Sequence, residues 1–148
     1  MNLFDSELTK INFSVKNKAE ALKQIAIDFQ RAGIIKDAHD FYLKIMAREQ
    51  KLSTGIGHGI AIPHLRDESV SKLQIGIYLL DNEIDFESLD KNKVKLILCF
   101  AVPSNEGNQY MKVLQKLSEF LRNENSRSVV YNCKDTEDLL RIFRSLEK

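Results

Sequence analysis

The residues best suited to chemistry lie close together, in the segment from Arg48 to His64. It reads REQKLSTGIGHGIAIPH, so a guanidinium, a glycine-rich stretch and an imidazole follow one another. A histidine with the ordinary pKa of about 6.5 is largely neutral near pH 7, and one ring nitrogen can then attack phosphorus without a separate base. Pro63 fixes its own φ and biases Ile62 towards an extended conformation, which makes the position of the ring reproducible. This pattern predicts a phosphoryl acceptor at His64.

The same segment contains the groups that a phosphate needs around it. Arg48 offers a planar fork that matches two phosphate oxygens. Gly55, Gly57 and Gly59 have no side chains, so their backbone amides can approach an anion closely, and Thr54 precedes them. We expect these five residues to bind and neutralise the phosphate, because phosphoryl transfer depends on positioning and on charge neutralisation.

Other interpretations of these residues find less support. The dinucleotide-binding fingerprint fails because Ile60 stands where its third glycine would be, and a Gly-Lys-Ser/Thr phosphate loop is absent. His58 and His64 have no third ligand near them in sequence, so we predict neither a metal site nor a cofactor. Taken alone, His64 would be an ordinary imidazole in a turn, and Arg48 a solvated cation at a helix end. Their combination argues for phosphoryl chemistry.

Composition excludes several classes of partner. The 148 residues include 22 Lys and Arg against 21 Asp and Glu, a net charge of +1, so no strong field exists to hold nucleic acid or an anionic membrane. The two cysteines are far apart in sequence, and the longest apolar run, residues 96–102, is too short to cross a bilayer. We therefore expect a cytoplasmic protein without direct membrane insertion, folded as one domain over residues 1–148.

The elements of the first half position the two chemical groups. Asn17 is suited to cap a helix over residues 18–32, and Asp37 a second helix that ends near Arg48. The three glycines of residues 53–59 predict a loop, because no regular element tolerates them well.

The second half predicts strands followed by helices. Alternating apolar residues indicate a strand over 73–79, and the nearly continuous apolar run 94–102 is typical of a strand at the centre of a sheet. Asn108 and Asp135 can each begin a helix, the first with Met111 and Leu114 inside, and a short strand is expected between the two helices. This order predicts an α/β fold in which helices flank a central, partly parallel sheet.

At these residues the chain resembles a known family. The segment is similar to the active-site region of enzyme IIA of the mannitol/fructose type of the bacterial sugar phosphotransferase system, which includes a nitrogen-regulatory branch. The resemblance covers almost the whole chain and rests on four matching stretches, Arg48–Glu49, Ser53–Gly57, Gly59–His64 and Ala101–Pro103.

The resemblance implies a fold and a reaction. The fold would be a single α/β domain with a mixed, mostly parallel central sheet flanked by helices. His64 would be phosphorylated on Nε2. The donor would be the phosphohistidine carrier protein, and in sugar-transporting members the acceptor would be a cysteine of an enzyme IIB component.

Two positions depart from the family pattern. The family usually has a second histidine seven residues after the proline of Ala-Val-Pro, where this chain has Tyr110. We expect Tyr110 to lie beside His64 and to donate one hydrogen bond to the phosphate. The family commonly has Asn inside the glycine loop, or a shorter loop, where this chain has His58, and we hypothesise that His58 restores a second imidazole from the other side.

Three functions follow from this interpretation. In the first, His64 takes a phosphoryl group from the carrier protein and passes it to a IIB component for sugar uptake. In the second, a regulatory one, phosphorylation controls binding to partner proteins. In the third, suggested by Tyr110, phosphorylation has been lost and only binding remains.

Overall fold

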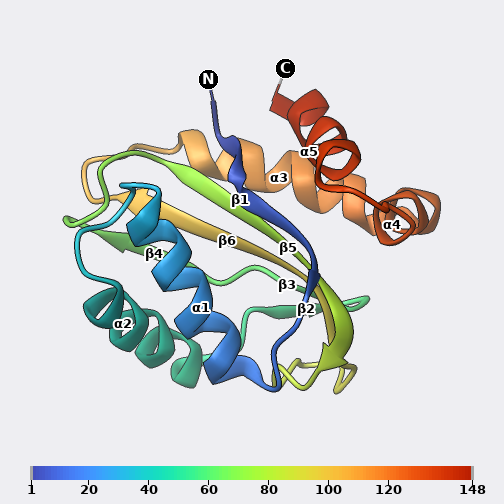
Figure 1. Cartoon of the computed structure of the whole chain (residues 1–148), viewed down its shortest axis with the longest axis horizontal. Helices are drawn as coiled ribbons and strands as arrows, with labels where there is room; N and C mark the ends of the chain where they lie inside the picture. Colours follow the sequence, from blue (N-terminus) through green and yellow to red (C-terminus); the bar gives the residue numbers. More distant parts are fainter. Residues whose placement is uncertain (1, 148) are drawn as a thin grey trace.

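The computed structural model describes residues 2–147 and shows a sheet with helices on both faces (Figure 1). The strands are β1 (Phe4–Phe13), β2 (Gly55–Gly57), β3 (Ile60–Ala61), β4 (His64–Asp67), β5 (Gln74–Ile84) and β6 (Val94–Pro103). The α-helices are α1 (Lys18–Arg31), α2 (Ala38–Lys51), α3 (Gln109–Arg122), α4 (Glu124–Tyr131) and α5 (Thr136–Arg144), and a short 3₁₀ helix covers Ser145–Glu147.

The sheet is mixed and mostly parallel, as expected. Its order is β1-β5-β6-β3-β2, and β4 also pairs with β6. The pairs β1/β5, β3/β6 and β4/β6 are parallel, while β5/β6 and β2/β3 are antiparallel. Strand β6 is central, which confirms the prediction made from its apolar run.

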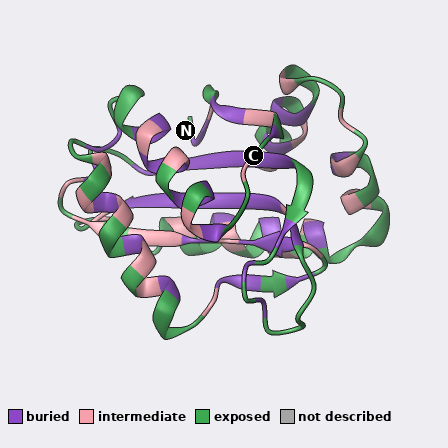
Figure 2. Ribbon diagram, turned by 60° about the horizontal axis from the view of Figure 1, so that its bottom comes forward, coloured by how far each residue is buried: buried purple, intermediate pink, exposed green. Residues whose placement is uncertain are grey.

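Two hydrophobic cores cover the two faces of this sheet. Along β6 the buried residues alternate between them, so that Ile97 belongs to the core under α1 and α2, and Leu98 to the core under α3 and α5. Figure 2 shows the consequence: buried residues follow the strands, and exposed residues lie on the outer sides of the helices. A strand buried on both faces needs apolar residues throughout, which is why β6 lacks a polar alternation.

Three helices begin at the predicted caps. The side-chain oxygens of Asn17, Asp37 and Asp135 accept hydrogen bonds from the backbone amide three residues later, at 2.8, 3.1 and 2.8 Å. Helix α2 continues to Lys51, so Arg48 lies in its last turn. Asn108 precedes α3 but makes no side-chain capping bond.

Several expectations are corrected by the structure. Strand β1 was not predicted, and the short strand expected between the last two predicted helices is replaced by helix α4, whose cap is Asn123. Met111 was placed in the core but is 48% exposed, because α3 turns Val113, Leu117 and Leu121 towards the sheet instead.

The two ends of the described chain are tied together. The amide of Leu3 donates to Glu147 Oε1 at 2.6 Å, and Arg144 Nη2 donates to the Phe4 carbonyl at 3.2 Å. Figure 1 shows both ends at the same side of the molecule, where β1 and α5 meet.

Candidate functional site

His64 is the first residue of β4, and the neighbouring strand holds its backbone. It pairs with Phe100 of β6, whose amide donates to the buried Pro63 carbonyl at 2.9 Å. The ring Nδ1 lies 3.1 Å from the carbonyl oxygen of Ile62. A carbonyl oxygen can only accept a hydrogen bond, so this contact requires the proton on Nδ1. In the neutral ring the lone pair then belongs to Nε2, at a half-buried position.

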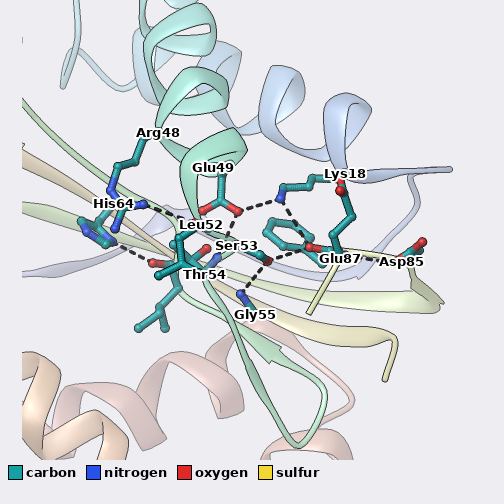
Figure 3. A network of polar contacts seen from close by, with 12 residues as sticks. Lys18, Arg48, Glu49, Leu52, Ser53, Thr54, Gly55, His64, Asp85 and Glu87 are labelled. Atoms are coloured by element: carbon teal, nitrogen blue, oxygen red, sulfur yellow. Dashed lines mark hydrogen bonds and ion pairs between the residues drawn. The ribbon is translucent and has the colours of Figure 1, made fainter. Parts of the chain in front are cut away.

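Arg48 approaches this imidazole from the last turn of α2, which packs against β4. Figure 3 shows its guanidinium pointing towards the His64 ring. Its recorded hydrogen bond is a long one, from Nη1 to the Leu52 carbonyl at 3.3 Å. Within residues 2–147 no carboxylate lies at ion-pair distance from Arg48. A cation that has no counter-ion among the described residues thus points towards the imidazole.

The glycine stretch is a hairpin where a loop was expected. Strands β2 and β3 pair antiparallel, and the turn between them has positive φ at both His58 (57°) and Gly59 (80°). Two successive positive φ angles are the hallmark of the type I′ turns that join tight hairpins. The Gly55 amide donates to Ser53 Oγ at 3.1 Å and is therefore occupied.

The glycines make room for protein neighbours. A Cβ on Gly55 would lie 2.1 Å from Ser88 Oγ, and one on Gly57 would lie 3.0 Å from Asp90 Oδ2. A Cβ on Gly59 would lie 3.2 Å from the hydroxyl of Tyr131, which donates to the His58 carbonyl at 2.8 Å. The close neighbours belong to the segment after β5 and to α4, and they explain why glycine occupies these three positions.

The hairpin tip also lies away from His64, contrary to the sequence expectation. Gly59 O accepts from Lys95 and Leu96 at the start of β6, whereas His64 pairs with Phe100. Leu96 and Phe100 are four positions apart along the strand, which corresponds to about 13 Å. The structure therefore does not bring Gly57, His58 or Gly59 to the imidazole.

Thr54 lies nearer to the site, but its backbone is used internally. Its amide donates to Glu49 Oε1 at 3.1 Å, and its carbonyl accepts from Ile62 at 3.0 Å. Its buried hydroxyl has no hydrogen-bond partner among the described residues. Thr54 is thus connected to His64 through Ile62.

Tyr110 is accompanied by an arginine that sequence reasoning missed. Arg66 lies two residues after His64 on β4, so its side chain leaves the strand on the same side. Its guanidinium carbon is 5.4 Å from the centre of the Tyr110 ring. The guanidinium nitrogens donate to the carbonyls of Ser104, Glu106 and Gly107. Among the described residues, no hydrogen bond or ring contact joins Tyr110 to His64. Side chains two positions apart on a strand lie on the same face, and this rule applied to His64 could have identified Arg66 from the sequence.

The far end of β4 is fastened to α2 by charges. Lys44 Nζ lies 3.1 Å from Asp67 Oδ1 and 3.0 Å from Asp40 Oδ2. Burial alone would raise the pKa of Asp67, but hydrogen bonds from Ser69 and Lys44 outweigh it and lower that pKa below its ordinary value. Hydrogen bonds that Lys44 donates to Asp40 and Asp67 raise the pKa of Lys44. This clamp joins the helix of Arg48 to the strand of His64.

Two kinds of feature are absent from the described residues. No group of three or more His, Cys, Asp or Glu side chains is arranged to hold a metal ion. Across the same residues, no helix combines the length and the apolar character that a membrane span requires.

Comparisons with known proteins agree with this architecture. The model of the family described as "Phosphoenolpyruvate-dependent sugar phosphotransferase system, EIIA 2" matches residues 2–146. The PTS system fructose-specific EIIABC component of Bacillus subtilis is 28% identical over 99% of this chain, which spans only 23% of that relative. The Nitrogen regulatory protein of Pseudomonas aeruginosa is 30% identical, over 89% of this chain and 86% of its own length.

Among solved structures, the Nitrogen Regulatory Protein IIA-Ntr from Neisseria meningitidis has the same fold. It superposes with a TM-score of 0.90, over 96% of this chain and 97% of its own, at 23% identity. The match of the family model over nearly the whole chain decides the assignment: this chain belongs to the EIIA 2 family of the phosphoenolpyruvate-dependent sugar phosphotransferase system.

Proposed function

We propose that the chain, acting as one IIA domain over residues 1–148, is a cytoplasmic phosphoryl carrier. His64 accepts a phosphoryl group from the phosphohistidine carrier protein and passes it to an enzyme IIB component for sugar uptake. One observation carries the proposal: the contact of Nδ1 with the Ile62 carbonyl leaves the lone pair on Nε2, in a ring towards which the guanidinium of Arg48 points.

The chemistry needs no further reagent. Nε2 of His64 attacks the phosphorus of the donor phosphohistidine, so a new P–N bond forms while the donor's P–N bond breaks. The positive charge that arises on the His64 ring is stabilised by donation from Nδ1 to Ile62. Arg48 neutralises the oxygens of the transferred group. In the second transfer a thiolate of the acceptor attacks phosphorus, and Nε2 regains its lone pair.

The assignment of an acceptor draws on the comparisons. The Bacillus subtilis relative is named as a component that combines A, B and C parts, and this chain corresponds to 23% of it. That combination supports a IIB component as the acceptor.

Labelling tests the proposal directly. The purified protein is incubated with radioactive phosphoenolpyruvate and the general phosphotransferase proteins, and we expect acid-labile, base-stable label. His64→Ala should abolish it, whereas His58→Ala, the matched control at the hairpin tip, should retain it. Label that survives in His64→Ala overturns the assignment, and label absent from the wild type favours a protein that only binds partners.

A regulatory role is the second candidate. The Pseudomonas aeruginosa relative, a Nitrogen regulatory protein, matches at 30% identity over 86% of its own length. In this case the phosphorylated and unphosphorylated forms would differ in affinity for a partner protein, and no IIB component would accept the phosphoryl group. Transfer of label to a IIB component supports the first role, and pull-down with phosphorylated and His64→Ala protein tests the second.

A further inference from the structure

A buried ion pair joins α1 to the end of α2, beside the segment that leads to His64 (Figure 3). Lys18 Nζ lies 2.8 Å from Glu49 Oε1, and the two side chains are 9% and 1% exposed. Lys18 Nζ also donates to the Phe86 carbonyl at 3.3 Å. Burying two charges carries a desolvation penalty, and apolar replacements of such pairs are often neutral or stabilising. Stability is therefore a weak reason for charges at this position.

The carboxylate of Glu49 is not even fully satisfied. Its Oε2 is buried and has no hydrogen-bond partner among residues 2–147. An unpaired buried oxygen carries a cost that an apolar side chain would avoid. Because the carboxylate of Glu49 carries this cost, we look for its role in the hydrogen bonds that its other oxygen makes.

Those bonds lead to the imidazole in three steps. Glu49 Oε1 accepts from the Thr54 amide at 3.1 Å. The Thr54 carbonyl accepts from the Ile62 amide at 3.0 Å, and the Ile62 carbonyl lies 3.1 Å from His64 Nδ1. Figure 3 shows this network running from Lys18 at one end to His64 at the other.

The first step acts where regular structure provides no support. Helix α2 ends at Lys51 and β2 begins at Gly55, so residues 52–54 lie in neither element. Side chains hold this connection, Glu49 through the amide of Thr54 and Ser53 through the Phe86 carbonyl at 2.8 Å. Loss of the Glu49 bond would release Thr54 and, with it, the carbonyl that receives the Ile62 amide.

We propose that Glu49, with Lys18 as its counter-ion, is a positioning residue for His64. By fixing Thr54 it fixes Ile62, and the Ile62 carbonyl keeps the proton on Nδ1 and the lone pair on Nε2. Glu49 touches neither the imidazole nor the phosphoryl group. The inference rests on the proposed function, because it concerns the atom that attacks phosphorus.

The tautomer of His64 is the readout that a purely structural role would not move. Long-range ¹H–¹⁵N correlation spectra of histidine-labelled protein distinguish Nδ1–H from Nε2–H, and His64→Gln assigns the signals. In the wild type we expect the Nδ1–H form. Lys18→Met/Glu49→Gln removes both charges but keeps an oxygen for the Thr54 amide, so the tautomer should persist. Lys18→Met/Glu49→Leu removes that oxygen too. Its ring should become a mixture of tautomers, and phosphoryl transfer should slow by up to about 100-fold.

A control separates this effect from lost stability. Tyr78→Phe removes a buried hydrogen bond of 3.0 Å to Asp28 Oδ2, outside the network, and should lower the melting temperature without moving the His64 tautomer. A wild-type ring protonated mainly on Nε2 overturns the proposal without any variant. So does a folded Lys18→Met/Glu49→Leu protein with the wild-type tautomer. If the tautomers behave as expected but the wild type takes no label, the proposed function fails and the positioning role stands.

Discussion

Replacement of Arg48 by lysine isolates the value of its planar fork. Lysine keeps the positive charge in the last turn of α2 but offers a single ammonium group where the guanidinium offers two parallel donors. Arg48 has no carboxylate partner within the described residues, and its bond to the Leu52 carbonyl is long, at 3.3 Å. The guanidinium therefore loses only this weak hydrogen bond when it turns to bind a phosphate.

The expected magnitude follows from one lost bond. A hydrogen bond to a charged group contributes about 1.5–3 kcal/mol, and each 1.36 kcal/mol of barrier is a factor of ten in rate. Arg48→Lys should therefore slow phosphoryl transfer roughly 10- to 150-fold. The change lies near the surface and preserves the charge at the helix end, so we expect the free energy of unfolding to stay within about 0.5 kcal/mol.

Rapid-quench measurement of transfer from the phosphorylated carrier protein gives the rate. Arg31→Lys is the matched control, because Arg31 occupies the last turn of α1 and its replacement should leave the rate unchanged. A folded Arg48→Lys protein that transfers at the wild-type rate would refute the reasoning. A large drop in thermal stability would instead assign a structural role to Arg48.

Three further outcomes are expected. His58→Asn should leave transfer and phosphohistidine lifetime unchanged, because the hairpin tip is about 13 Å from the imidazole along β6; a slower transfer would restore the idea of a second imidazole. Gly55→Ala should destabilise the fold by about 1–3 kcal/mol in denaturant unfolding, since its Cβ would lie 2.1 Å from Ser88 Oγ, and added Ser88→Gly should recover only part of the loss, because the Ser88 Cα would still lie 3.0 Å from that Cβ. The pKa of Asp67 is lowered in the folded protein, so its stabilising effect is present above the ordinary value of 3.8 and is lost as pH falls through the folded value. Melting curves from pH 7 to pH 2 should show this loss in the wild type but not in Asp67→Asn, and parallel curves would contradict it.

Local signals predicted the parts of the fold that depend on local physics. Asn17, Asp37 and Asp135 cap helices by accepting hydrogen bonds from the amides three positions ahead. The residue types that cap in this way can be recognised in a sequence. The apolar run of β6 identified the centre of the sheet for a similar reason. Strand β1 escaped detection because irregular pairing with β5 breaks its alternation, with register shifts after Phe4 and after Lys10.

Residues of the candidate site could be proposed from sequence where one residue type fits one task. His64 after Pro63, and Arg48 near a helix end, were assigned from their chemistry, and the structure places them near one another. The glycines were ambiguous, because the absence of a side chain suits a bound phosphate and a close protein neighbour equally. Only the tertiary structure identifies the neighbour of Gly55 as Ser88. The contact of Arg66 with Tyr110 and the ion pair of Glu49 with Lys18 likewise join residues that are distant in sequence.

The junction of the two chain ends has a consequence for how this fold can be built into larger proteins. Leu3 meets Glu147 at the edge formed by β1, and two strands, β5 and β6, separate that edge from β4, a span of about 14 Å. A neighbouring domain fused before or after this unit would be attached at the same side. His64 lies three strand positions from this edge, in the row of the sheet that also contains Phe4, Ile75 and Phe100. The same geometry makes the unit suitable for circular permutation, because a short flexible linker closes the gap between its ends.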